Sequence, residues 1–277
     1  MESTDYTDSV ADLWDDLLAC LDLSELPSGS EFEGQNLHLS YHRLFGGQLL
    51  AQFVMAASMA CPGKAVKSVH ALFPREGRSG EPVRYQVERH HEGATFATLT
   101  IGARQSHGVI ATASVSVHAA EEGRSLQTAA PVPEVAGAGQ QVELGLLPFD
   151  TRSADNLDSA EAAPPEFSLW LRTPPAGAGL AAALLAYATD LTLIGTALRP
   201  VAGVSQRDAG TAFTSAVTSH TVWFHRDFRC DQWLLLRQHS PLLASGRCFG
   251  RGDVLTADGS LVASYAQEAL LRFKGSS

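Results

Sequence analysis

The chain repeats one order of elements, and this repetition limits the folds it can adopt more than any other feature. A long apolar stretch at residues 45–60 precedes four runs with strand-like alternation, and a second apolar stretch at residues 183–199 precedes four more. Short segments of the two halves also correspond, since ADGSLVAS at residues 257–264 resembles SHGVIATA at residues 106–113. We interpret the chain as an internal duplication.

Each half, on this interpretation, uses its long helix to cover one face of its own antiparallel sheet. The turn sequences GRSGEP, HHEG and SHG separate the strand-like runs of the first half. Two such sheets that join edge to edge leave two fewer strand edges exposed. We therefore predict an α+β fold in which one wrapped sheet surrounds two long central helices.

Three segments follow from this pattern. Residues 1–118 form an N-terminal repeat that includes a leading amphipathic helix at residues 9–23. Residues 119–167 are rich in Ala, Pro, Glu, Gly and Ser and lack sustained periodicity, so we expect a linker there. Residues 168–277 form the C-terminal repeat.

Composition excludes several classes of protein. The net charge of −10 argues against a nucleic-acid partner, because no basic field is available to release counterions from phosphates. No uninterrupted apolar run approaches the roughly 18 residues that span a bilayer, so we expect no membrane span. The polar, acidic start gives no sign of a signal peptide, and four scattered cysteines fit reduced thiols in the cytoplasm.

Motifs for cofactors and metals are missing from the sequence. We find no GxSxG, GxxxxGK[ST] or GxGxxG pattern, and therefore expect no nucleotide or other cofactor. His38 and His42 have an HxxxH spacing but lack a third ligand, so we expect no metal site. A cofactor-free hydrolase remains compatible with the sequence.

One carboxylate interrupts the second apolar stretch. Asp190 lies inside ALLAYATDLTLIGTALRP, where burial of an unpartnered charge is costly. Two interpretations remain open at this point. Asp190 is a functional group in a buried site, or it is a structural carboxylate that caps a helix.

Five sequence blocks, found in the same order, resemble the type II acyl-CoA thioesterases with a double hotdog fold. The blocks cover nearly the whole chain and are LFGGQLLAQ (44–52), SVHALFPREG (68–77), ATDLTLIGTALRP (188–200), HTVWFHRDF (220–228) and DGSLVASYAQEALLR (258–272). The resemblance implies hydrolysis of fatty acyl-CoA thioesters to free acid and CoA by an activated water, without a covalent intermediate.

The resemblance also implies site residues in the C-terminal repeat. In the family an aspartate, a Ser or Thr and a glutamine hold the attacking water, and the first and last of these map onto Asp190 and Gln267. The hydroxyl position aligns with Val217, which has no hydrogen-bonding group. A β-bulge would turn Thr218 to replace it. The nearby alternatives in a regular strand are Ser215 and Ser219.

Other positions are candidates for substrate binding. Backbone N–H groups at Gly46 and Gly47, where a helix begins, could bind an oxyanion, or these glycines could simply allow a tight turn and close packing. Arg75 and Arg226 are candidates for CoA phosphates, with Arg199 and Arg229 as further ones, and the alternative for each is a solvated arginine. His220 and His225 fit structural hydrogen bonds better than catalysis.

The expected partner is an acyl-CoA substrate in fatty acid and lipid metabolism. The resemblance further implies a homo-oligomer. Because Val217 lacks the family's hydroxyl, the alternative function is a catalytically weakened acyl-CoA-binding or regulatory hotdog protein. A hotdog relative that hydrates or dehydrates acyl groups has the least support from the sequence.

Overall fold

The computed structural model describes residues 3–39 and 43–275, and the chain divides into two compact units. The first unit contains residues 1–123, 145–148 and 179–188. The second unit contains residues 124–144, 149–178 and 189–277. Each unit combines helix with an antiparallel sheet, as the repeated sequence pattern predicted.

The first unit holds six strands, two whole helices and nearly all of a third within its described part. The helices are α1 (Ser3–Leu21), α2 (Gly46–Ala60) and residues 181–188 of α3 (Ala181–Thr189). The strands are β1 (Ser24–Glu25), β2 (Glu31–Gly34), β3 (Ala65–Leu72), β4 (Val83–Glu92), β5 (Phe96–Gln105) and β6 (Gly108–His118). They pair antiparallel in the order β1-β2-β4-β5-β6-β3.

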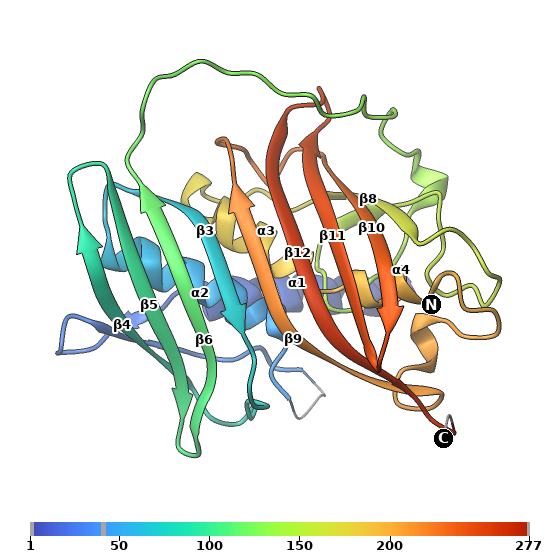
Figure 1. The fold of residues 1–277 in the computed structure, drawn as a ribbon, viewed down its shortest axis with the longest axis horizontal. Helices are drawn as coiled ribbons and strands as arrows, with labels where there is room; N and C mark the ends of the chain where they lie inside the picture. Colours follow the sequence, from blue (N-terminus) through green and yellow to red (C-terminus); the bar gives the residue numbers. More distant parts are fainter. Residues whose placement is uncertain (1–2, 40–42, 276–277) are drawn as a thin grey trace. The chain divides into compact units, whose positions relative to one another are not determined.

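Helix α2 covers one face of this sheet. Figure 1 shows it passing behind the strands β4, β5, β6 and β3, and it contacts all four. Its buried side includes Leu50, Phe53 and several alanines, whose small side chains let a helix approach a sheet closely. The apolar pattern of residues 45–60 therefore predicted both the helix and its burial.

The second unit contains the remaining strands and α4 (Leu193–Leu198). Its strands are β7 (Asp150–Arg152), β8 (Glu166–Arg172), β9 (Phe213–Phe224), β10 (Leu234–Ala244), β11 (Arg247–Thr256) and β12 (Leu261–Phe273). They pair antiparallel in the order β9-β12-β11-β10-β8-β7. Helix α4 contacts β10, β11 and β12 (Figure 1). Short 3-10 turns are η1 (Ala138–Gln140), η2 (Ala178–Leu180) and η3 (Gln206–Asp208).

The second long helix is interrupted, and the prediction of one helix over residues 183–199 is wrong. Helix α3 (Ala181–Thr189) ends directly before Asp190, and α4 begins at Leu193. Thr192 precedes α4, and its carbonyl accepts the first backbone hydrogen bond from Thr196. Asp and Thr favour helix ends because their side chains compete for backbone hydrogen bonds.

Two further sequence expectations concern residues 119–167 and the membrane. The segment expected as a linker includes β7, and β8 begins at its end, so part of it pairs within the second sheet. The stretch Ala178–Leu198 is long and apolar enough, by length and composition, to span a bilayer. Of its most apolar 18-residue window, 67% is buried within the protein, as in the core helix of a globular protein.

Candidate functional site

Asp190 lies at the break between α3 and α4 and is buried, with 5% of its surface exposed. The preceding residue, Thr189, is fully buried. Gln238 of β10 holds the chain just beyond the break, because its Nε2 donates to Thr192 Oγ1 at 2.5 Å. The hydroxyl of Thr196 in α4 donates to Gln238 Oε1 at 3.0 Å. These bonds fix the backbone that carries the carboxylate.

A β-bulge in β9 decides which side chains face Asp190. Ala269 of β12 pairs with Val217, whereas Glu268 pairs with Ser219, so Thr218 is the extra residue of the bulge. Beyond the bulge, Gln267 pairs directly with His220. Both of these side chains are buried, at 2% and 0% exposure.

The His220 side chain contacts Gln267, Thr189 and Asp190. Its Nδ1 lies 2.8 Å from Gln267 Oε1, and its Nε2 lies 3.0 Å from Thr189 Oγ1. The same Nδ1 lies 3.7 Å from Asp190 Oδ1. The imidazole also stacks on the Tyr265 ring, with 6.1 Å between centroids. The structure thus gathers Asp190 and Gln267, both predicted from the sequence, around a histidine.

Burial keeps this histidine neutral. Loss of solvation lowers the pKa of His220 from 6.5 to about 4, and the hydrogen bond with Gln267 offsets only part of that effect. At 3.7 Å the contact with Asp190 is too long for a hydrogen bond, and a neutral imidazole does not form an ion pair. His220 is therefore a polar neighbour of the carboxylate rather than its counter-ion.

Among the described residues, the side-chain amide of Gln267 is hydrogen-bonded through its oxygen but not through its nitrogen. Its Oε1 accepts from His220, while its Nε2 is buried and has no hydrogen-bond partner among residues 3–39 and 43–275. A buried amide donor left unpaired costs about 1–3 kcal/mol. A ligand oxygen or a water at this point would satisfy it, as expected for a binding position.

Val217, at the family's hydroxyl position, and its neighbours Thr218 and Ser219 do not supply a hydroxyl to the cluster around Asp190. Val217 packs against an apolar cluster that includes Phe213 and Leu271. The Thr218 hydroxyl donates to the carbonyl oxygen of Glu268 at 3.0 Å. The bulge also reverses the expectation for Ser219, which no longer shares the face of Val217 because it alternates with buried His220.

The glycines at the start of α2 lie in the first unit. A Cβ at Gly47 would collide with the backbone oxygen of Tyr187 and the ring of Phe45. Phe45 and Tyr187 themselves pack edge to face, with 5.1 Å between ring centroids. Gly47 is therefore required for close packing, whereas oxyanion binding at Gly46 and Gly47 stays a prediction.

The candidate phosphate-binding arginines bond to backbone carbonyls. Arg75 donates to the carbonyl of His107 in the first unit. In the second unit, Arg226 donates to the carbonyl of Leu261 at 2.5 Å and to Ser125 Oγ at 3.1 Å. These contacts hold loops, and phosphate binding by either arginine stays a prediction.

A polar network is buried in the first unit as well. Gln52 Nε2 donates to the carbonyls of Cys20 and Gln35, each at 2.8 Å, and its Oε1 accepts from Tyr85 at 2.6 Å. Gln48 donates to Gln52 at 3.2 Å. These interior amides are therefore matched by protein groups.

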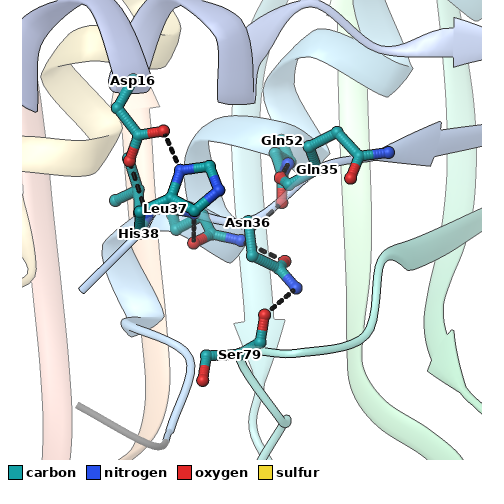
Figure 2. Close-up of polar contacts among 8 residues, drawn as sticks. Asp16, Gln35, Asn36, Leu37, His38, Gln52 and Ser79 are labelled. Carbon is teal, nitrogen blue, oxygen red and sulfur yellow. Dashed lines mark hydrogen bonds and ion pairs between the residues drawn. The ribbon is translucent and has the colours of Figure 1, made fainter. Parts of the chain in front are cut away.

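Figure 2 shows the rim of this network. Asn36 donates to the carbonyl of Ser79 at 3.1 Å, and Asp16 contacts both the backbone nitrogen and the ring of His38. Within the described residues, no group of three or more His, Cys, Asp or Glu side chains could hold a metal ion. His42, the second residue of the HxxxH pattern, lies outside the described residues.

Sequence reasoning did not assign His220, Thr189 or Gln238 to the site. The sequence favours a structural hydrogen bond for His220, because HTVWFHRDF is rich in Trp and Phe. Gln238 stands among other polar residues in LLLRQHS, so the sequence gives no distinct signal that it is buried.

Comparisons with known proteins agree along most of the chain. Residues 38–118 match the family described as Acyl-CoA thioesterase N-terminal domain, and residues 115–271 match Acyl-CoA thioesterase C-terminal domain. Acyl-CoA thioesterase 2 of Haemophilus influenzae is 29% identical over 292 aligned residues, which cover 95% of this chain and 99% of that protein.

Solved structures agree with this result. An acyl-CoA thioesterase II, TesB2, from Mycobacterium marinum is 30% identical, with a TM-score of 0.78, and the match covers 94% of this chain and all of that one (100%). A hot dog fold protein of unknown function from Alicyclobacillus acidocaldarius has a TM-score of 0.72 at 18% identity, covering 92% of this chain and 97% of that one. The second likeness shows the fold alone. The chain has the predicted α+β double hotdog fold.

Proposed function

We propose that the cluster around Asp190 is the hydrolytic site of this chain, which belongs to the acyl-CoA thioesterase family and hydrolyses acyl-CoA thioesters. The observation that carries the proposal is the convergence of Asp190 and Gln267 on His220 in a buried position. Two residues 77 positions apart, chosen from the sequence as a pair, meet through one imidazole.

The proposed chemistry uses Asp190 as the general base. A water oxygen attacks the thioester carbonyl carbon while Asp190 takes one proton from that water. The carbon–sulfur bond then breaks, and the CoA sulfur leaves with the proton that Asp190 returns. Gln267 Nε2, a donor, would hold the water oxygen or the carbonyl oxygen. His220 is a poor proton acceptor here because burial lowers its pKa to about 4.

Direct attack by water is proposed over an acyl-enzyme. A single turnover in ¹⁸O-labelled water is expected to place ¹⁸O in the released fatty acid and none in the protein. An acyl anhydride at Asp190 that water opens at the aspartyl carbonyl would instead leave label in that carboxylate and none in the fatty acid of the first turnover. Mass spectrometry of the Asp190 peptide and of the fatty acid distinguishes this route from direct attack.

The finer assignments are proposals of the same kind. We expect fatty acyl chains in the substrate, an oxyanion at the Gly46 and Gly47 amides, and CoA phosphates at Arg75 and Arg226. A homo-oligomer is expected from the resemblance to the family, and a cytoplasmic location from the four scattered cysteines, which fit reduced thiols. Light scattering of the purified protein tests the oligomer, and Arg226→Ala is expected to raise KM for acyl-CoA more than it lowers kcat.

The decisive experiment removes the proposed base. Asp190→Asn and Gln267→Ala are assayed for thiol release from acyl-CoAs of increasing chain length. We expect kcat to fall about 10³-fold for Asp190→Asn, within the range for a lost general base. Cys20 and Cys230 react slowly with the thiol reagent of the assay, because burial raises the pKa of both thiols to about 12.

Asp253→Asn is the matched control, because Asp253 lies on β11, is exposed and bonds Ser264 at 2.7 Å. Its activity should equal that of the unmodified protein. Wild-type turnover in a folded Asp190→Asn variant would refute the proposed site. Acyl-CoA binding without turnover in the unmodified protein would instead support the weakened, regulatory alternative, for which the burial of Val217 in an apolar cluster is the relevant observation.

A further inference from the structure

The hydrogen-bond partners of His220 determine where its proton lies. Gln267 Oε1, 2.8 Å from Nδ1, can only accept a hydrogen bond, so Nδ1 carries the hydrogen. Nε2 then accepts from the Thr189 hydroxyl at 3.0 Å. A lone pair on Nδ1 would face Asp190 Oδ1 at 3.7 Å, whereas an N–H there is attracted to the carboxylate. Both arguments select the same tautomer.

The ring is also held against rotation. His220 has no exposed surface, stacks on Tyr265 at an interplanar angle of 13° and is bonded at both nitrogens. Thr189 is the last residue of α3 and directly precedes Asp190. The same imidazole therefore connects the helix end that carries the carboxylate with the strand that carries Gln267.

This arrangement fixes the amide of Gln267. Because the His220 N–H occupies Oε1, the buried Nε2 is the end of the amide left for a ligand. With a hydrogen on Nε2 of His220 instead, the amide would turn round and offer its oxygen, which cannot donate to a carbonyl or an oxyanion.

We propose that His220 is a positioning residue that acts through Gln267: it holds the amide with Nε2 directed to the water or thioester oxygen, and the Asp190 carboxylate, 3.7 Å from Nδ1, favours the required tautomer. The inference rests on the proposed function of Asp190 and Gln267. It assigns no proton transfer to His220, because both of its nitrogens are already hydrogen-bonded. A histidine that only fills the core is the alternative.

The test compares three substitutions. His220→Leu removes both hydrogen-bonding atoms, while His220→Asn keeps a donor near the place of Nδ1. We expect kcat to fall about 100-fold in His220→Leu, with KM changed less than about threefold, as for a lost transition-state contact. His220→Asn should recover about tenfold of that loss. His225→Leu, the same change at an exposed residue just beyond β9, should leave kcat unchanged.

A double-mutant cycle separates positioning from core filling. If His220 acts through Gln267, adding His220→Leu to Gln267→Ala should lower kcat by less than about twofold. An additive further loss of about 100-fold, or wild-type kcat in a folded His220→Leu variant, would overturn the inference. Unfolding curves in urea verify that each variant is folded.

The proposed function fails by a different result. Wild-type kcat in both Asp190→Asn and Gln267→Ala would refute the proposal that these residues form the hydrolytic site. If those two variants lose activity while His220→Leu keeps it, the site stands and only the positioning role is wrong.

Discussion

The two units both bury glutamine amides, and among the described residues the two sets of amides differ in how fully the protein satisfies them. In the first unit, Gln52 donates to two carbonyls and accepts from Tyr85 and Gln48. In the second unit, Gln267 accepts from His220 but its Nε2 has no partner within the described part of the chain. A fully hydrogen-bonded amide such as that of Gln52 stabilises the fold. A buried amide with an unpaired donor, such as that of Gln267, is expected where a ligand supplies the missing hydrogen bond.

The second difference between the units concerns charge. The amides of the first unit bond to neutral groups, namely backbone carbonyls, a tyrosine hydroxyl and other amides. The cluster of the second unit contains a carboxylate, Asp190, and a histidine whose pKa burial lowers. We therefore expect changes in the first unit to affect stability, and changes in the second to affect catalysis and pH response.

The largest of the effects that bear on this contrast is the pH dependence of stability. The pKa of His220 is about 4 in the folded protein and 6.5 ordinarily, so below pH 6.5 the unfolded chain binds a proton that the folded protein does not. The contribution of neutral His220 to the free energy of unfolding is fully present above pH 6.5 and is lost as the pH falls to 4. The loss is roughly 3 kcal/mol.

Urea unfolding at pH 7, 5.5 and 4 measures this effect as the difference between the unmodified protein and His220→Asn. That difference should shrink as the pH falls. The corresponding difference for Gln52→Leu, in the first unit, should stay constant. If the difference in unfolding free energy stays constant with pH for both variants, the pKa of His220 is not lowered in the folded protein.

A smaller effect is expected from opening the network of the first unit. Gln52→Leu leaves the hydroxyl of Tyr85 and the carbonyls of Cys20 and Gln35 without their amide partner. We expect a loss of about 2 kcal/mol in the free energy of unfolding. The kcat per folded molecule should remain within about twofold of the unmodified value. A large fall in kcat with unchanged stability would reverse the contrast between the units.

The smallest expected effect concerns the break between α3 and α4. Gln238→Leu removes the bonds to Thr192 and Thr196, so the backbone beyond Asp190 is less firmly held. We expect kcat to fall about tenfold, which corresponds to about 1.4 kcal/mol in the barrier. Steady-state thiol release measures it. Gln141→Leu, an exposed residue of the second unit, is the control and should have no effect.

Much of this fold followed from local sequence pattern. Periodicity placed α2, the four strands from β3 to β6 and the four from β9 to β12, because hydrophobic alternation reflects which face of each element is buried. Asp190 stood out because a carboxylate in an apolar run needs an explanation at any position in a core. Short strands such as β7 carry too few residues for a period to appear, and residues 119–167 were therefore expected as a linker.

The sequence by itself determined the duplication, the order of helix and strands, and the pairing of Asp190 with Gln267 through the family resemblance. Only the tertiary structure decided that Thr218 is the extra residue of a bulge and that His220 faces Gln267. The physical reason is the two-residue period of a strand. One inserted residue exchanges the faces of all later side chains, and its position depends on pairing with β12 rather than on the sequence of β9 alone.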